Sequence, residues 1–410
     1  MTASSQPSSR IRVLQIIGNA IVGGMETSVA RLLESASPSR FALTALCPFE
    51  SPYTDQLREL DVDVCIAPMP DNASWEAIQV ACSLIETQSI DVVHTHLPPA
   101  HLLGGLAGRL TQRPVVATIH GRQLTTLDLE VHRRMRTHLH LVCRQSHLNA
   151  HALGIEPDHI SFIPNGVDTE VFKPSAYKHG PLRQRFGIPA AAKVVGFVGR
   201  LSPEKGPDLF VRMALALHEH DARVHFLMVG DGPMRAQVEA AIAGSKLDNV
   251  FHLAGVQESM ADVYREMDMF VSSSRSEAMP LAIMEAMASG LPTVATSVGG
   301  ILELVQQGRT GWLVGEGDYE SLAARALALL SDETALQAVG AHARERAVRK
   351  FALMDSVAAI TSLWQRLAQQ RGDALRLVAA PAETRMNDDE APRTDSVPTV
   401  RAMSPLAANL

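Results

Sequence analysis

Short runs of apolar residues, many of them β-branched, alternate along this chain with longer stretches in which apolar and polar residues recur at helical spacing. Uninterrupted apolar runs bounded by glycine, proline or polar residues are typical of parallel strands buried on both faces. Stretches with apolar residues three and four positions apart are typical of helices that cover such a sheet. The alternation therefore predicts an α/β protein with doubly wound parallel sheets.

The first part of the chain, residues 11–172, carries one complete series of these elements after a polar N-terminus at residues 1–10 that we expect to be flexible. We expect strands at Arg12–Ile17, Ala42–Cys47, Val62–Ala67, Asp91–His96, Val115–His120, Leu139–Cys143 and Ile160–Pro164. The clearest helices between them are expected at Met25–Ser35, Trp75–Glu86 and Ala100–Leu110. This series is enough for one Rossmann-like domain.

An irregular stretch with proline and glycine, Pro164–Pro174, separates the first series from a second one, and we place the domain boundary there. The second domain is expected over residues 173–370. Its strands are expected at Lys193–Gly199, Val224–Val229, Val250–Leu253, Met269–Ser273 and Pro292–Ser297, and its helices at Pro207–His220, Met234–Ala243, Leu281–Ala288 and Tyr319–Leu330. The sequence thus predicts two similar Rossmann-like halves.

The C-terminal part begins with a further helical stretch, from Met354 to about Gln370, which can return to the first domain. Beyond it, residues 371–410 mix alanine, proline, threonine, aspartate and arginine without a usable period. Such a composition cannot bury enough apolar surface to order itself, so we expect a disordered tail.

Composition and charge narrow the class of protein. The chain has 410 residues, is 46% hydrophobic and carries a net charge of −7, so it can bury large cores and has no global attraction to nucleic acid. Its four cysteines, Cys47, Cys65, Cys82 and Cys143, show no Cys-x-x-Cys spacing and are interpreted as buried reduced thiols. No window approaches the roughly 20 apolar residues of a membrane span, and we interpret the protein as cytoplasmic.

The segment Ser276–Gly290 is the most informative one in the chain. Pro280 and Gly290 bracket a short helix whose residues are apolar on every side, apart from Glu285. A carboxylate in such surroundings is costly unless it is hydrogen-bonded, and ligand hydroxyls are suitable partners. The alternative is a buried glutamate bonded to the backbone.

Glu277 precedes the same helix. Backbone N–H groups at the start of a helix have no partner within it and can meet an anionic or polar ligand. The residues concerned are Ala278, Met279, Pro280 and Leu281, of which Pro280 contributes no N–H. Two glutamates with seven residues between them, followed by Ala-x-x-x-Gly-Leu-Pro-Thr-Val-Ala-Thr, resemble the signature of the retaining glycosyltransferases of family 4, which have two Rossmann-like domains in the architecture called GT-B.

Three further segments resemble the same family in order and spacing. Gly199–Gly206 is similar to the family's diphosphate-binding loop and places Arg200 and Lys205 after the first strand of the second domain. Gly18–Thr27 resembles its glycine-rich first loop, in which Gly23 and Gly24 allow the backbone to approach phosphate. His120 ends a strand where the family carries a functional histidine; taken alone, it is more simply a strand-end histidine bonded to a neighbour.

The resemblance implies an acceptor domain followed by a donor domain, and transfer of a sugar from a nucleotide diphosphate donor to an acceptor hydroxyl with retention of configuration. It implies no cofactor and no required metal. A saccharide or lipid-linked acceptor, in surface polysaccharide or glycolipid synthesis, and a UDP-sugar donor are expected; guanosine and adenosine donors stay open. After Glu277 the family often has Gly or Pro with an aromatic residue, where this chain has Ala278-Met279-Pro280.

The resemblance also implies a role for each matching residue. Arg200 and Lys205 would bind the diphosphate and Glu285 the ribose. Glu277, with the backbone from Ala278 onward, would hold the sugar hydroxyls. Gly24 would touch phosphate from the first domain, and His120 would lie beside the donor sugar and the acceptor.

Two other classes of protein are weighed against this interpretation. A nicotinamide-dependent oxidoreductase would share the Rossmann halves, but neither Gly18–Gly24 nor Gly230-Asp231-Gly232-Pro233 forms Gly-x-Gly-x-x-Gly. A catalytically silent protein that binds nucleotide sugars would keep the donor-binding residues and show no transfer.

Two groups of residues suggest a metal site superficially. His94 and His96 could lie on one face of a strand with His101 nearby, but no carboxylate or cysteine completes a ligand set. Asp61-Val62-Asp63 has the Asp-x-Asp form of metal-dependent transferases with another fold, but nothing else from that fold accompanies it. We therefore predict no metal.

A local basic segment lies in the presumed acceptor domain. Between Arg109 and Arg144 there are seven arginines and two acidic residues, a local charge of +5. These arginines either form a solvated helix face or attract anionic lipid headgroups or a diphosphate-linked acceptor at the inner face of the membrane.

Overall fold

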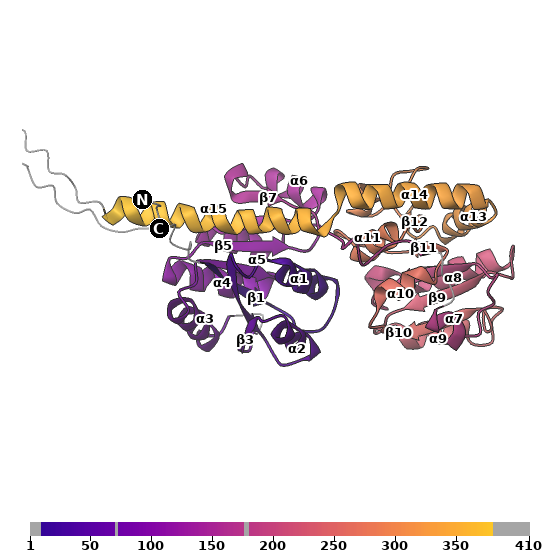
Figure 1. Ribbon diagram of the computed structural model, residues 1–410, viewed down its shortest axis with the longest axis horizontal. Coiled ribbons are helices and arrows are strands. Elements are labelled where there is room, and N and C mark those ends of the chain that lie inside the picture. The colour runs from indigo at the N-terminus through magenta and orange to yellow at the C-terminus, as the bar shows by residue number, and fades with distance from the viewer. Residues whose placement is uncertain (1–9, 70–72, 176–179, 380–410) are drawn as a thin grey trace, which may run out of the picture. The chain divides into compact units, whose positions relative to one another are not determined.

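The computed structural model describes residues 10–69, 73–175 and 180–379 (Figure 1). The described residues up to Arg371 form one compact unit that contains two parallel sheets. The fold is therefore α/β with two Rossmann-like halves, as the alternation of apolar runs predicts. Within the described residues, no helix combines the length and the apolarity needed to cross a lipid bilayer.

The first sheet has seven parallel strands in the order β3-β2-β1-β4-β5-β6-β7. The strands are β1 (Ile11–Ile17), β2 (Phe41–Cys47), β3 (Asp63–Ile66), β4 (Val92–His96), β5 (Val115–Ile119), β6 (His138–Leu141) and β7 (Ile160–Phe162). The helices are α1 (Gly24–Ser35), α2 (Pro52–Glu59), α3 (Trp75–Thr87), α4 (Pro98–Thr111), α5 (Thr126–Met135) and α6 (Arg144–Ala152), with the short turn η1 (Pro157–His159). Strand β5 is buried at every position, as expected for an apolar run of this kind.

The second sheet has six parallel strands in the order β10-β9-β8-β11-β12-β13. The strands are β8 (Val194–Val198), β9 (His225–Val229), β10 (Phe251–Gly255), β11 (Met269–Ser272), β12 (Thr293–Thr296) and β13 (Gly311–Val314). The helices are α7 (Pro181–Arg185), α8 (Pro207–His218), α9 (Arg235–Ile242), α10 (Met260–Arg265), α11 (Leu281–Ala288), α12 (Ile301–Leu304), α13 (Tyr319–Leu330) and α14 (Glu333–Lys350), with the turn η2 (Pro203–Lys205).

The chain passes between the two sheets twice, and the two passages lie side by side. Val167 N–H donates to Phe351 O at 2.8 Å, and Leu353 N–H donates to Val167 O at 2.9 Å. Gly166 is required at this crossing, because a Cβ there would lie 2.6 Å from Leu353 Cα. The pairing joins the linker to the start of the last helix, α15 (Leu353–Ala379).

Helix α15 packs on the first sheet although it follows the second in sequence (Figure 1). Its Trp364 is fully buried and meets the Phe41 ring of β2 at 5.5 Å between centroids. The helix continues to Ala379, so the expected end near Gln370 is too early. Because residues 371–379 are helical, the disordered tail cannot begin at residue 371; its remainder, residues 380–410, lies outside the described residues.

Candidate active site

Loops from both sheets occupy the position where open α/β sheets bind ligands. The order of each sheet reverses once, between β1 and β4 in the first and between β8 and β11 in the second. Ligands of such sheets bind beyond the carboxyl ends of the strands at these reversals. The loops at 18–23, 199–206 and 273–280 follow β1, β8 and β11 respectively, so the topology assembles the motifs that the sequence singles out.

Lys205 and Glu277 are in direct contact. Lys205 Nζ donates to Glu277 Oε1 at 2.7 Å, and Ser274 Oγ donates to the same oxygen at 2.9 Å. Glu277 is 9% exposed and therefore has few water molecules around it. The loop after β8 and the loop after β11 thus meet through a charged pair, beside the start of α11.

Two consecutive glycines support the backbone of Glu277 and Ala278. A Cβ on Gly299, which has φ +51°, would lie within bonding distance of Glu277 O, and one on Gly300 would overlap Ala278 O. Gly300 N–H also donates to Glu277 O at 3.2 Å. The sequence analysis missed both residues, although a Gly-Gly pair one residue after the expected strand Pro292–Ser297 was a signal for a close backbone approach.

A second glycine pair supports the loop that carries Arg200. Gly230 has φ +125°, and a Cβ there would lie 2.0 Å from Gly199 O. Asp231 O accepts from Leu201 N–H at 2.9 Å, and a Cβ on Gly232 would meet the Leu201 backbone. These glycines therefore allow the backbone of the neighbouring loop to approach closely, and they do not form a dinucleotide-binding fingerprint.

Glu285 on α11 is bound by two side chains of the protein. Its Oε1 accepts from Arg31 Nη2 of α1 at 2.7 Å, and its Oε2 accepts from Tyr264 Oη at 3.0 Å. Burial raises the pKa of Glu285, and Arg31 and Tyr264 partly oppose that rise. From the sequence, either ligand hydroxyls or backbone groups were expected to bind the Glu285 carboxylate. In the structure, the side chains of Arg31 and Tyr264 bind it instead. Each oxygen keeps lone-pair capacity for a further hydrogen bond.

Arg31 is a site residue that the sequence analysis missed. Its guanidinium lies over the Phe172 ring, 5.2 Å from the centroid. Its Nη1 is buried and has no hydrogen-bond partner among the described residues. Nothing in the local pattern of α1 distinguishes this arginine from a surface arginine, because its partner lies 254 positions away.

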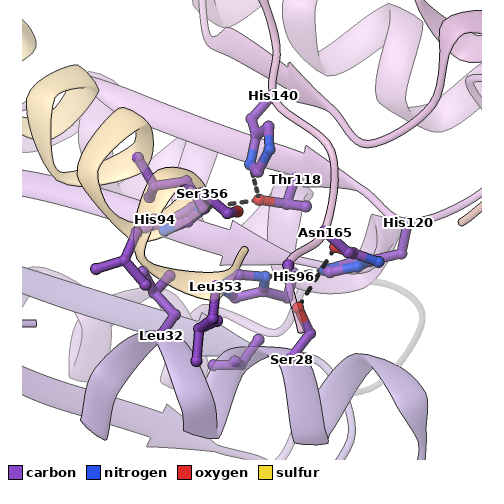
Figure 2. Close-up of a pocket in the computed structure, with 14 residues that line it drawn as sticks. Ser28, Leu32, His94, His96, Thr118, His120, His140, Asn165, Leu353 and Ser356 are labelled. Atoms are coloured by element: carbon purple, nitrogen blue, oxygen red, sulfur yellow. Dashed lines mark hydrogen bonds between the residues drawn. The ribbon is translucent and has the colours of Figure 1, made fainter. Parts of the chain in front are cut away.

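A small cavity lies between the first sheet, α1 and the start of α15 (Figure 2). Its volume is about 20 Å³, room for about one water molecule. Asn165 lines it, accepts from Ser28 Oγ at 3.4 Å and donates through Nδ2 to Met279 O at 3.0 Å. Asn165 therefore connects α1 with the loop before α11.

His120 lies directly after β5 and lines the same cavity (Figure 2). Its Nε2 is 3.1 Å from His96 Nδ1. Burial, with a smaller effect of the neighbouring His140, lowers the pKa of His120 to about 3. His120 is therefore an uncharged imidazole at neutral pH.

The remaining expected site residues are partly exposed and partly buried. Gly23 precedes α1 and Gly24 begins it, and a Cβ on Gly24 would meet no atom within 4 Å. Arg200 is exposed after β8. Met279 and Leu281 are buried, and α11 begins at Leu281. The structure thus places Lys205 in contact with Glu277, whereas Gly24 and Arg200 are exposed to solvent.

The histidines considered as metal ligands use their ring nitrogens within the protein. His94 contacts Thr118 and Trp364, His96 contacts His120 and Gln15, and His101 contacts Asp128 and Thr137. Asp63 accepts from Gln88, and Asp61 lies in a turn at φ +63°. Among the described residues, no group of three or more metal-ligating side chains converges.

The arginines between Arg109 and Arg144 do not form one surface. The Arg122 side chain lies against the Gly299 position of the second half, and Arg144 N–H donates to Glu303 Oε1 at 2.6 Å. Arg113 donates to Ile90 O. The exposed members are Arg109, Arg133, Arg134 and Arg136 near the ends of α4 and α5, together with Arg144.

Two protein-family models match the chain and together span most of it. The model described as Glycosyltransferase Family 4 matches residues 22–171, and the model described as Glycosyl transferases group 1 matches residues 192–332. The first match contains β2 to β7, and the second contains all six strands of the second sheet together with Lys205, Glu277 and Glu285.

Curated relatives and solved structures agree with these matches. A UDP-Gal:alpha-D-GlcNAc-diphosphoundecaprenol alpha-1,3-galactosyltransferase of Escherichia coli is 27% identical over 87% of this chain and 97% of its own length. A GDP-mannose-dependent alpha-mannosyltransferase of Mycobacterium tuberculosis is 29% identical over 78% of this chain and 87% of its own. The structure of HepE of Anabaena with UDP and glucose superposes with a TM-score of 0.77 at 20% identity, over 87% of this chain and all of that one.

Proposed function

The chain belongs to the family 4 glycosyltransferases with the GT-B architecture, which use nucleotide-sugar donors, and we propose that it transfers the sugar with retention of configuration and without a metal. The oxidoreductase alternative is excluded, because both family matches are to glycosyltransferases. The observation that carries the proposal is the contact of Lys205 with Glu277 at the reversal of the second sheet.

We assign the donor site to the second half. Arg200 and Lys205 bind the diphosphate, and Glu285 binds the ribose beside Arg31. Glu277 and the backbone of residues 278–281 hold the sugar. Two observations support this assignment. Lys205 Nζ lies 2.7 Å from Glu277 Oε1, and both residues lie beyond the carboxyl ends of the adjacent strands β8 and β11. The exposed Gly24 at the start of α1 provides a phosphate approach from the first half.

We propose a UDP-sugar as donor and a saccharide or lipid-linked saccharide as acceptor. The E. coli relative is named for UDP-Gal and a diphosphoundecaprenol acceptor, and the Anabaena structure contains UDP and glucose. The M. tuberculosis relative is named for GDP-mannose, so the nucleotide base of the donor is the first property to test. A role in surface polysaccharide or glycolipid synthesis follows from these acceptors.

The proposed function is tested by incubating the full chain with UDP-, GDP- and ADP-sugars and measuring released nucleoside diphosphate without acceptor. We expect slow hydrolysis of one donor class, with retention in the products once an acceptor is found. A protein that binds a nucleotide diphosphate but releases none from any donor, with saccharide or lipid-linked acceptors present, would be a silent binding protein.

Activity is expected to persist in excess EDTA. The positive charges of Arg200 and Lys205 can stabilise the departing diphosphate, which is the usual task of a metal in sugar transfer. The measurement is the initial rate before and after chelation. Loss of activity that manganese or magnesium restores would contradict the prediction and would make Asp61 and Asp63 candidate metal ligands.

Lys205→Ala is expected to weaken nucleoside diphosphate binding by about 1.5–3 kcal/mol, the scale of a charge-assisted hydrogen bond. Titration calorimetry measures this change. Lys246→Ala is the matched control, because Lys246 is an exposed lysine in the same half that pairs with Glu219 at 3.2 Å. Unchanged affinity in a folded Lys205 variant would remove the lysine from the donor site.

We propose a peripheral contact with anionic membranes through the exposed arginines of α4 and α5. Arg109, Arg133 and Arg134 support it, although Arg134 also pairs with Glu130 at 3.1 Å. The chain is expected to co-sediment with vesicles containing anionic lipid at low salt and to detach as salt rises. Equal sedimentation of a variant with Arg109, Arg133 and Arg134 all changed to serine would contradict this contact.

A further inference from the structure

A second cavity lies in the half that carries α14, between that helix and the turn at residues 306–310 after α12 (Figure 1). Its volume is about 170 Å³, room for on the order of ten water molecules, whereas the cavity beside His120 has about 20 Å³. None of its lining residues is among those that we assign to the donor site. Its charged and titratable lining residues are Arg309 from the turn and His342, Glu345, Arg346, Arg349 and Lys350 from α14.

Helical spacing places most of these side chains on one face of α14. Glu345, Arg346 and Arg349 follow His342 by three, four and seven positions, and residues at this spacing are neighbours on a helix surface. His342, Glu345 and Arg349 are exposed, and Arg346 is half-buried. Solvent and dissolved ions therefore reach this face of the helix, opposite Arg309.

Positive charge exceeds negative charge in the lining of this cavity by three. Four cationic side chains share one carboxylate, in a chain whose net charge is −7. Arg349 Nη1 lies 3.1 Å from Glu345 Oε1, and Arg309 Nη2 lies 4.0 Å from Glu345 Oε2. The Lys350 ammonium forms no ion pair with the described residues. Glu345 alone cannot neutralise its four neighbours.

The protein itself fixes the position of Arg346. Its Nε donates to Leu304 O at 2.8 Å and its Nη2 donates to Glu303 O at 2.6 Å, so backbone carbonyls at the end of α12 hold two of its nitrogens. The guanidinium also lies over the Phe351 ring, 5.5 Å from the centroid. Its Nη1 has no hydrogen-bond partner among the described residues. Arg346 is thus held in place before any ligand arrives, with one donor group unused.

Arg309 and Arg346 repel one another across the cavity. Burial, with a smaller contribution from the charge of Arg309, lowers the pKa of the Arg346 guanidinium. Arg309 and Arg349 have side chains that are 59% and 67% exposed, so both can turn toward a ligand without breaking a packed core. An anion between these side chains would relieve the repulsion.

The number of charges favours one class of anion. A phosphomonoester carries nearly two negative charges at neutral pH and offers three strong acceptor oxygens. Guanidinium groups bind phosphate through two parallel hydrogen bonds, an arrangement that a single lysine cannot provide. A carboxylate would balance only one of the three excess charges, so it fits this lining less well.

We propose that this cavity binds a phosphomonoester or diphosphate group at a place separate from the donor site. Arg346 orients the group, Arg309, Arg349 and Lys350 supply the remaining positive charge, and Glu345 weakens the binding by its own charge. The phosphoryl group can belong to a soluble phosphate ester or to a lipid headgroup. This site goes beyond the proposed function, because nothing in its chemistry requires sugar transfer.

The first test uses His342 as a reporter inside the cavity. The full chain, labelled with ¹³C in its histidine rings, is titrated with inorganic pyrophosphate and followed by NMR, and His342→Asn identifies the His342 signal by its loss. We expect a saturable shift of this signal in the parent protein and also in Lys205→Ala, whose donor site binds diphosphate more weakly. No shift in the parent, or no shift in Lys205→Ala, would overturn the proposal.

The second test changes the charge of the lining in both directions. Arg309→Gln combined with Arg349→Gln is expected to weaken pyrophosphate binding at the His342 signal by about tenfold or more. Glu345→Gln is expected to strengthen it by about threefold or more, because the opposing charge is removed. The matched control combines Arg223→Gln and Arg325→Gln, two exposed arginines of the same half. Equal affinity in the two double variants, or weaker binding in Glu345→Gln, would contradict the site.

The third test identifies the source of the phosphoryl group. Sedimentation is measured with phosphatidylcholine vesicles that contain phosphatidic acid, whose headgroup is a phosphomonoester. Binding that the Arg309 and Arg349 double variant loses and the control pair keeps would assign the site to a lipid headgroup. Equal sedimentation of both double variants, together with the pyrophosphate response, would assign it to a soluble phosphate ester. None of these tests needs a sugar donor, so a failure of the proposed function, seen as no transfer from any donor, would leave their outcome unaffected.

Discussion

Glu277→Gln is expected to lower kcat by about 100-fold or more, the size of comparable electrostatic contributions in active sites. The donor sugar gains positive charge as its bond to phosphate breaks, and the Glu277 carboxylate is placed to stabilise that charge. Glutamine keeps the shape of the side chain and can still accept from Lys205 and Ser274, so the change removes mainly the negative charge. Steady-state kinetics with the identified donor measure the effect.

Glu285→Gln is the matched comparison for this prediction. We expect it chiefly to raise the donor KM, because a ribose contact made equally in the ground and transition states contributes to binding alone. Both variants must first melt like the parent protein, since each glutamate is largely buried. Full kcat in Glu277→Gln would refute the catalytic role of this residue.

Gly300→Ala is expected to reduce kcat/KM by about 100-fold, because a displacement of about 1 Å in positioned groups has effects of this size. A methyl group there would overlap Ala278 O, so the backbone of the donor loop must shift. Gly300 itself has φ −72°, which alanine adopts without strain, and the effect is therefore steric. The variant is measured by kinetics and by nucleoside diphosphate titration.

Gly315→Ala is the control for this steric effect. A Cβ at Gly315 would meet only Asp318 Cβ at 3.8 Å, an ordinary contact in the same half of the protein. We expect parental activity in Gly315→Ala. If Gly300→Ala were equally active, the loop of Glu277 and Ala278 would be adaptable, and its precise position would not matter for transfer.

The strands were the most predictable part of the fold. The expected strand over Val115–His120 is observed at Val115–Ile119, and most others differ by one or two residues at their ends. Buried parallel strands are apolar at most positions, which makes them visible in the sequence. Strand β13, Gly311–Val314, was not expected; two of its four residues are partly exposed, so it does not form a fully buried run.

Several helices were not predictable from their pattern. Helix α14, Glu333–Lys350, is rich in charged residues and buries mainly alanine, glycine and two larger aliphatic residues. Its Gly340 lies against Gly290 O, where a Cβ would be 2.2 Å away. Such a helix is stabilised by close packing on α11 rather than by a broad apolar face, and this packing is not a local property of its sequence.

The sequence alone determined the α/β class, the two halves, and the segments with Lys205, Glu277 and Glu285, because strand burial and motif spacing are local properties of the chain. Only the tertiary structure decided which of these groups meet. The partners of Glu285, Met279 and His120 are Arg31, Asn165 and His96, which come from other elements of the fold. Such contacts depend on how the sheets are ordered and packed. The spacing of apolar residues in the sequence does not indicate which polar side chains will contact one another.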